Sequence, residues 1–172
     1  DIMYNDFVIV GPSGDPAAAG LASSAVDALA RIAAQNATFV SRGDDSGTHR
    51  KELELWAQAG QDTGSFERWY KSVGAGMGAA LNTAAGLSAY ILSDRASWLS
   101  FGNKNDLTLV FHGDPALFNQ YAYLPVNPDR HGHVKSLWTR RMEDWLTSDR
   151  ARDLINGYQI DGQQLFVFNA VH

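Results

Sequence analysis

The residues best suited to chemistry lie between Arg42 and Thr48, where an arginine, a turn and Ser46-Gly47-Thr48 precede a helical pattern. A short apolar run ending at Val40 predicts a strand before them. The strand would deliver the chain to a helix N-terminus carrying free backbone N–H groups, two hydroxyls and a guanidinium. Exposed N–H donors, a positive helix-dipole end and a planar cationic fork suit a small oxyanion.

An ordinary capped helix is the simpler interpretation of the same residues. Ser46 or Asp45 would then cap the helix, and Arg42 would pair with Asp44. The position of Arg42 directly after a strand favours an anion site, because ligands of open α/β sheets bind beyond the carboxyl ends of strands.

A second glycine-rich loop, Gly74-Ala75-Gly76-Met77-Gly78, precedes another helical pattern. It lacks the sixth-position glycine of the dinucleotide fingerprint and the Gly-Lys-Ser/Thr of a P-loop, so we expect no nucleotide cofactor. Two interpretations stay open: glycine allows close helix packing, or Gly76, Met77 and Gly78 offer a second helix N-terminus to the same anion.

Other candidate sites carry weaker signals. His131 and His133 flank a glycine in a turn-forming segment without a third ligand at a known metal spacing, which favours a solvated loop. Ser46, His112 and Asp114 could supply a triad, but no Gly-x-Ser-x-Gly elbow surrounds Ser46. We therefore expect no metal ligand and no catalytic residue.

Composition bounds the class of protein. The chain has 172 residues with 45% hydrophobic residues, which predicts a packed core. A net charge of -5 argues against nucleic-acid partners and anionic membrane surfaces. The absence of cysteine excludes disulfides, thiol catalysis and cysteine-ligated zinc. No apolar run approaches a membrane span of about 20 residues, and no signal peptide is recognisable in these residues.

Strand-like and helix-like segments alternate, which predicts an α/β fold with a mainly parallel sheet and flanking helices. A stripe of Leu137, Trp138, Met142 and Trp145 predicts a core-facing helix surface. Pro125 weakens the strand around it or places it at an edge. The segment 66–73 is ambiguous. The expected strands are 3–10, 37–40, 89–92, 107–111, 121–126 and 165–168, and the expected helices are 21–34, 46–59, 79–84, 95–101, 134–146 and 148–155.

With the segment Ser41–Thr48 as its centre, the chain resembles the tungstate-binding proteins of ABC importers, a branch of the type II periplasmic solute-binding proteins. The resemblance covers nearly the whole chain and its combination of motifs is specific, although phosphate-binding relatives share the Arg-x-Asp-x-Ser-Gly-Thr core. The other segments that carry it are Met3–Pro12, Gly74–Gly78, Ser93-Asp94-Arg95, Gly113-Asp114-Pro115, Leu117-Phe118-Asn119 and Asp144–Ser148.

The resemblance implies two α/β lobes joined by two hinge strands, with the anion in the cleft. Residues 1–10 would form the outward hinge strand, and residues 11–119 a complete lobe carrying the anion loop. Residues 120–172 would form the return strand and the C-terminal part of the other lobe. The threonine-rich anion loop of that lobe is missing, so we expect a truncated chain with the Trp138 stripe uncovered. Exposed apolar surface of this kind favours a homodimer or a swapped assembly.

The resemblance also implies a function. The protein would be a periplasmic or extracytoplasmic receptor, not an enzyme, that binds tungstate or molybdate without a cofactor and delivers it to a membrane permease. By the family pattern, Arg42 would fork onto two anion oxygens, and Ser46 and Thr48 would donate hydroxyl hydrogen bonds. The full set of implied anion-binding residues is Arg42, Ser46, Gly47, Thr48, Gly76, Met77 and Gly78.

Three alternatives stay open: a phosphate or molybdate receptor of the same fold, an anion-sensing domain of a transcription regulator, and a hydrolase. The orientation of Asp44 separates two of the ligands. Phosphate keeps a proton at neutral pH and can donate it to a carboxylate, whereas tungstate has none to give. Asp44 pointing toward the ligand would favour phosphate, and Asp44 turned back onto Arg42 or backbone N–H groups would favour tungstate.

Overall fold

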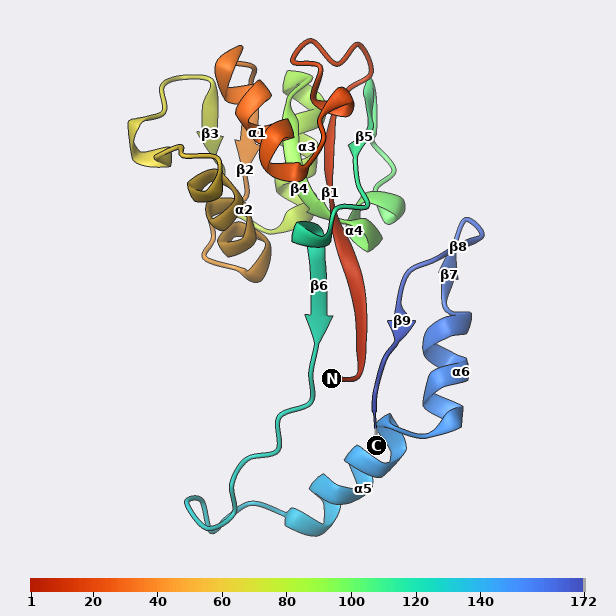
Figure 1. The fold of residues 1–172 in the computed structure, drawn as a ribbon. Helices are drawn as coiled ribbons and strands as arrows, with labels where there is room; N and C mark the ends of the chain where they lie inside the picture. The colour runs from red at the N-terminus through yellow and green to blue at the C-terminus, as the bar shows by residue number, and fades with distance from the viewer. Residues whose placement is uncertain (172) are drawn as a thin grey trace. The chain divides into compact units, whose positions relative to one another are not determined.

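The computed structural model describes residues 1–171, which form two compact units (Figure 1). Residues 6–118 make up the larger unit, and residues 1–5 join the segment from Asn119 onward in the smaller one. The chain therefore passes between the units at Asn5–Asp6 and again at Phe118–Asn119. None of the helices within residues 1–171 has the length and apolar character that a membrane span requires.

The larger unit is built on a sheet with the strand order β3-β2-β4-β1-β5. The strand β2 is parallel to β3 and β4, whereas β1 is antiparallel to both β4 and β5. The prediction of a mainly parallel sheet is thus corrected to a mixed sheet. The strand β1 runs antiparallel to β4, so that Phe7 lies opposite Asp94, the last residue of β4. The bounds are β1 Met3–Pro12, β2 Phe39–Ser41, β3 Tyr70–Ser72, β4 Tyr90–Asp94 and β5 Leu107–Phe111.

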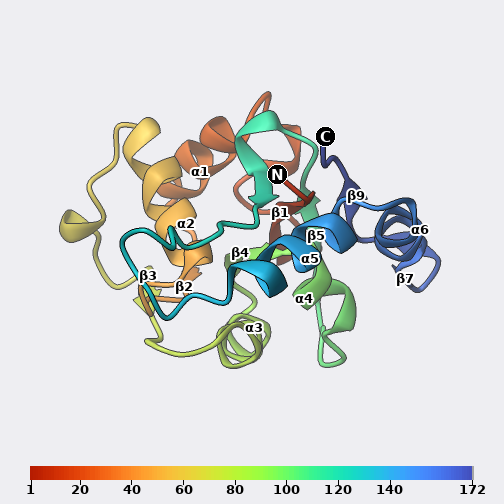
Figure 2. The same ribbon diagram turned by 90° about the horizontal axis from the view of Figure 1, so that it is seen from below.

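Helices cover both faces of this sheet (Figure 2). Side chains alternate along the strands, so that Ile9 packs with α1 and α2 while its neighbour Val8 packs with α3 and α4. Both apolar faces need cover, and a three-layer α/β/α arrangement follows. The helices are α1 Ala25–Ala34, α2 Gly47–Gln58, α3 Met77–Leu87 and α4 Arg95–Ser100, with short 3₁₀ turns at Ala19–Leu21, Thr63–Ser65 and Pro115–Leu117.

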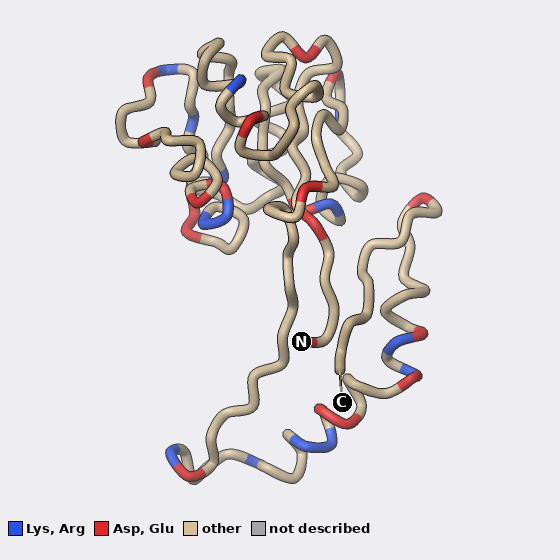
Figure 3. The backbone as a smooth tube through the Cα atoms, in the orientation of Figure 1, with Lys and Arg blue, Asp and Glu red and all other residues tan. Residues whose placement is uncertain are grey.

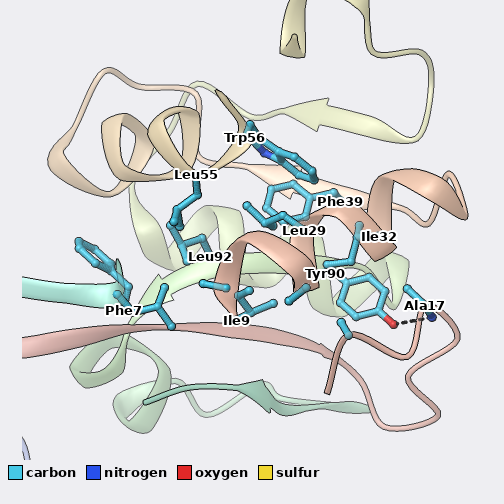
Figure 4. Close-up of a cluster of buried hydrophobic side chains, with 14 residues drawn as sticks. Phe7, Ile9, Ala17, Leu29, Ile32, Phe39, Leu55, Trp56, Tyr90 and Leu92 are labelled. Atoms are coloured by element: carbon cyan, nitrogen blue, oxygen red, sulfur yellow. Dashed lines mark hydrogen bonds between the residues drawn. The ribbon is translucent and has the colours of Figure 1, made fainter. Parts of the chain in front are cut away.

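Aromatic side chains fix α2 against the sheet (Figure 4). The rings of Phe39 and Trp56 meet edge to face with centroids 5.2 Å apart, and both side chains are fully buried. Tyr90 lies over Gly11, where an added Cβ would come within 2.4 Å of the ring. The Tyr90 hydroxyl accepts a hydrogen bond from the Ala17 N–H at 3.0 Å. This packing holds the start of β2 and the last turns of α2 in the core.

The smaller unit contains β6, which pairs with β1, and β9, which is antiparallel to β1 at Met3 and Tyr4. The predicted return strand 121–126 was misplaced, because the strand ends at Tyr121, before Pro125, which cannot donate to a ladder. The elements are β6 Phe118–Tyr121, α5 Ser136–Leu146, α6 Asp149–Gly157, β7 Gln159–Ile160, β8 Gln163–Gln164 and β9 Val167–Phe168.

The apolar stripe of α5 is exposed. Trp138 is 61% exposed and Trp145 47% exposed, and Leu137 and Met142 are exposed to a similar degree. The prediction from helix periodicity that Trp138 and Trp145 are core residues is therefore wrong for residues 1–171, whereas the expectation from the family resemblance that this stripe is uncovered is confirmed. Periodicity identifies the apolar face of a helix but does not supply the surface that covers it.

Candidate anion-binding site

The loop between β2 and α2 contains the residues with the clearest chemistry. Ser46 is the N-cap of α2, and its hydroxyl accepts from the His49 N–H at 3.4 Å. The next two backbone N–H groups, those of Gly47 and Thr48, have no hydrogen-bond acceptor within residues 1–171. The capped-helix interpretation is therefore correct, and the capped helix still leaves an open N-terminus.

Asp44 is turned back into this loop. One carboxylate oxygen accepts from Arg42 Nε at 2.8 Å, and the other accepts from the Ser46 N–H at 3.2 Å. Hydrogen bonding from the Ser46 side chain, and then from its N–H, together with the Arg42 charge, holds the pKa of Asp44 below its usual range. The Ser46 N–H and the Ser46 hydroxyl are thus both directed at Asp44, so the hydroxyl would have to turn away from this carboxylate to donate to a ligand.

Arg42 keeps its two terminal nitrogens available. The Asp44 contact uses Nε alone, and no acceptor within residues 1–171 contacts Nη1 or Nη2. The Arg42 side chain is 22% exposed. A guanidinium held through Nε and open at its fork can engage two oxygens of one anion.

The second glycine-rich loop is joined to the first. Ser41 lies opposite Ser72 in the parallel pairing of β2 and β3. Beyond these residues the Val73 N–H donates to the Ser41 carbonyl at 3.0 Å, and the Ala75 N–H donates to the Arg42 carbonyl at 3.2 Å. The helices α2 and α3 therefore both begin at the same edge of the sheet.

The N-terminus of α3 is also open. Gly76 is its N-cap and supplies no side chain, and the N–H groups of Met77 and Gly78 have no acceptor in the described part of the chain. A Cβ at Gly76 or Gly78 would meet no atom within 4 Å, so close packing does not explain these glycines. The Met77 side chain is buried in the core, which leaves its backbone as the group that could meet a ligand.

Charged residues of both signs gather around α2 and the loop before it (Figure 3). Two pairs of them form ion pairs, Arg42 with Asp44 and Arg50 with Asp45. Arg50 donates to both oxygens of Asp45 at 3.0 and 2.9 Å, which lowers the pKa of Asp45. The Asp45 N–H donates to His49 Nδ1 at 3.0 Å. Sequence reasoning did not anticipate these contacts of Asp45. The Asp45–Arg50 pair is strongly exposed and stabilises the loop little.

Glu52 is a residue that sequence reasoning missed. It is 1% exposed, and its Oε1 accepts from the Tyr70 hydroxyl at 2.6 Å and from Trp56 Nε1 at 3.3 Å. Burial raises the pKa of Glu52 to about 7, although the Tyr70, Ser41, Trp56 and Arg42 groups around it favour the charged form. The available signal was its spacing, since Glu52 lies one helical turn from both Thr48 and the buried Trp56.

The competing sites are not assembled within residues 1–171. Asp114 accepts from the N–H groups of Ala25 at 2.6 Å and Ala116 at 2.8 Å, and no hydrogen bond joins it to His112 or Ser46 in this part of the chain. Among the same residues, no group of three histidine, aspartate or glutamate side chains could hold a metal ion.

Comparison with known proteins identifies the family. A model described as a PBP superfamily domain matches residues 1–150. The chain belongs to the PBP superfamily. Within it, the chain is 41% identical to the tungstate-binding protein TupA of Peptoclostridium acidaminophilum, covering 99% of this chain and 60% of that protein. This PBP-superfamily chain thus spans about three-fifths of the length of that curated relative.

Solved structures of tungstate-binding proteins are similar to this chain in both fold and sequence. The structure of TupA from Desulfovibrio alaskensis G20 matches with a TM-score of 0.85 and 40% identity over 98% of this chain and 69% of that one. The tungstate ABC transporter structure from Geobacter sulfurreducens matches with a TM-score of 0.79 and 45% identity over 92% of this chain and 66% of that one. The chain is a homologue of TupA, and its PBP family is one of binding proteins rather than enzymes.

Proposed function

We propose that this chain binds tungstate as the anion-capturing part of a receptor for an ABC importer. The observation that carries the proposal is the Arg42 guanidinium, which Asp44 holds through Nε while its terminal nitrogens stay available. The joined loops add the open N-termini of α2 and α3 at the same sheet edge. Relatives named as tungstate-binding proteins support this ligand.

The orientation of Asp44 favours an anion without a proton. Both of its oxygens already accept hydrogen bonds, from Arg42 and from Ser46, so it is not a free acceptor for a protonated ligand. Hydrogen phosphate would need such an acceptor, whereas tungstate and molybdate need donors alone. We infer that tungstate and molybdate are preferred over phosphate.

Each residue has a distinct task in this proposal. Arg42 binds two oxygens through its fork and offsets one of the two negative charges. The Thr48 hydroxyl and the N–H groups of Gly47 and Thr48 donate to the anion, and the Ser46 hydroxyl joins them by turning from Asp44 to the anion. Around the second helix terminus, Gly76, Met77 and Gly78 present backbone donors. No bond is made or broken, so affinity depends on the number and direction of these donors.

Titration calorimetry of the chain with tungstate, molybdate, sulfate and phosphate tests the proposal. We expect tungstate and molybdate to bind and phosphate to bind at least about tenfold more weakly, a difference of about 1.4 kcal/mol. Arg42→Ala should weaken tungstate binding about 100-fold, because a charge-assisted pair of hydrogen bonds is lost. Arg50→Ala, which removes an exposed arginine paired with Asp45, is the matched control and should change affinity less than about threefold. Equal binding of all four anions, or an Arg42→Ala chain with unchanged affinity, would contradict the proposal.

The partners follow from the same role. We propose that a membrane permease of the importer receives the anion and that the protein acts outside the cytoplasm. We further propose that two copies of the chain associate through the exposed α5 face, because Trp138, Met142 and Trp145 form an apolar surface there.

A further inference from the structure

A polar cluster lies directly behind the anion loop, inside the layer between α2 and the sheet. Its centre is the Glu52 carboxyl, which accepts from Tyr70 on β3 at 2.6 Å and from Trp56 on α2 at 3.3 Å. The buried Ser41 hydroxyl at the end of β2 has no hydrogen-bond partner of normal length within residues 1–171. A carboxyl in this position joins α2 to β3 behind the anion loop.

The carboxyl is close to the proposed anion site along two routes. Glu52 lies four residues after Thr48 on one face of α2, a spacing that puts the two side chains about 6 Å apart at their Cβ atoms. The second connection is through the backbone of Arg42, whose N–H hydrogen-bonds to the Glu52 carboxyl and favours its charged form. A dianion bound at Thr48 and Arg42 would therefore face a negative charge through a dry protein layer whenever Glu52 is ionised.

Few other charged groups face this carboxyl. Tyr70 is the titratable side chain in contact with it, and burial raises the pKa of that phenol well above its usual range, so it stays neutral. In the anion loop, the charged side chains of Arg42 and Asp44 pair with each other. The helix α1 and the strand β4 also pack on α2, and within residues 1–171 they contribute no hydrogen bond or ion pair to Glu52. Of the groups named here, Glu52 is thus the one behind the anion loop whose charge changes near neutral pH.

We propose that Glu52 is a positioning residue of the anion site, and that capture of a tetrahedral dianion is coupled to uptake of a proton by its carboxyl. This inference rests on the proposed anion-binding function. Protonation removes a buried negative charge from beneath the site, and the bound dianion in turn favours the protonated carboxyl. Anion affinity then falls as the pH rises above neutrality. The anion would be bound near neutral pH and released at high pH, and the residues that contact the anion would not have to move.

Calorimetry in pairs of buffers that differ in ionisation enthalpy tests the coupling. Tungstate binding to the full chain near pH 7 should take up a fraction of a proton. Affinity should fall about sixfold between about pH 6.5 and 8.5, out of the tenfold total that a shift of about one unit in a linked pKa produces. Glu52→Gln keeps the shape of the side chain and cannot ionise. In that variant proton uptake should vanish, and affinity should vary less than about twofold over the same range.

Glu54→Gln is the matched control, because Glu54 is an exposed residue on the same helix that pairs with Lys51. It should bind tungstate with the pH dependence of the unaltered chain. Tyr70→Phe gives a second test if Glu52→Gln folds poorly. Removal of the Tyr70 hydrogen bond should raise the pKa of Glu52 and move the affinity profile to higher pH.

The outcomes separate this inference from the proposed function. Tungstate binding without proton uptake, or an unchanged pH profile in Glu52→Gln, would overturn the inference and leave the proposed function standing. A chain that binds none of the oxyanions would overturn both.

Discussion

Arg42 pairs with a carboxylate through Nε and still leaves its terminal nitrogens available, in a chain of net negative charge. The carboxylate of Asp44 orients the guanidinium through Nε, and the same carboxylate is occupied by the Ser46 N–H, so it cannot compete for the fork. In the proposed function, the acidic chain would capture an anion by fixed local donors rather than by long-range attraction. Affinity in such a site follows hydrogen-bond geometry, and single donors can be tested one at a time.

Thr48 is the first such donor. Its side chain is buried, and no protein group accepts from its hydroxyl in residues 1–171. We expect Thr48→Val, which keeps the branched shape, to weaken tungstate binding about five- to tenfold, because a net hydrogen bond contributes about 1 kcal/mol. Calorimetry checks this, with Thr83→Val on α3 as the control. A variant that binds as tightly as the unaltered chain would show that Thr48 does not donate to the anion.

Glu52 links stability to pH. Its pKa is raised from 4.5 to about 7 in the folded chain, so the folded state binds more protons than the unfolded state between these values. Stability is therefore greatest below about pH 4.5 with respect to this group, and it is lost as the pH rises through about 7, by up to about 3 kcal/mol.

Glu52→Gln should remove this dependence and leave the chain more stable than the unaltered protein at pH 8. Urea unfolding at several pH values between about 5 and 8 measures it. Glu54→Gln should retain the slope of the unaltered chain. A Glu52→Gln chain with an unchanged slope would contradict a buried, protonated carboxyl.

At the scale of elements, the site depends on how two strand–loop–helix connections meet. The parallel pairing of β2 and β3 brings both connections to one edge, and two backbone hydrogen bonds from the second loop to Ser41 and Arg42 join them. Gly43 permits the closest approach. Its φ is +63°, and an added Cβ would lie 1.9 Å from Ser72 Oγ. A side chain at this position would both strain the backbone and push the loops apart.

Gly43→Ala should therefore destabilise the chain by about 1–3 kcal/mol and weaken tungstate binding together with stability. Thermal unfolding and calorimetry measure the two effects. Ser72→Ala in the same chain should restore part of the loss, since it removes the clash and leaves the backbone strain. Gly102→Ala is the control, because its Cβ would meet nothing within 4 Å. Equal stability of the two single glycine variants would contradict a tight junction at Gly43.

At the scale of the whole molecule, two compact units share one chain that passes between them twice. In the smaller unit, the side chains that flank these passages are joined: the Asn119 side-chain amide donates to Asn5 Oδ1 at 2.7 Å. The same unit carries the exposed α5 face, where the Arg141 guanidinium lies 5.0 Å from the centre of the Trp138 ring. An apolar face of this composition resembles the core of a protein interface.

Association through α5 is the prediction at this scale. The chain should form dimers at micromolar concentration, and replacement of Trp138 and Trp145 by glutamine should shift it toward monomers, because a large apolar area no longer leaves water. Light scattering with a dilution series measures the change. Leu21→Gln alters an exposed apolar residue in the larger unit and should leave the association unchanged. A monomeric unaltered chain would contradict the prediction.

Local patterns were sufficient for several elements. Alternation of large and branched residues predicted the strand 107–111 with its observed bounds, and the Ser46 cap predicted the start of α2 to within one residue. Hydroxyl, glycine and arginine spacing pointed to the loop of residues 42–48 as an oxyanion site, a role that stays a proposal. These features depend on neighbours in sequence, which is why a pattern in the chain can reveal them.

Long-range register decided the rest. The direction of β1, the joining of the loops at Gly43 and the burial of Glu52 all depend on residues distant in sequence. The orientation of Asp44 is an intermediate case, since both interpretations were available from the sequence and the packed loop selected one. The sequence by itself determined which elements form and which donors they carry, because hydrogen bonding and side-chain periodicity act locally. Only the tertiary structure decided which ends meet and which charges are buried, because strand pairing and packing bring distant segments into contact.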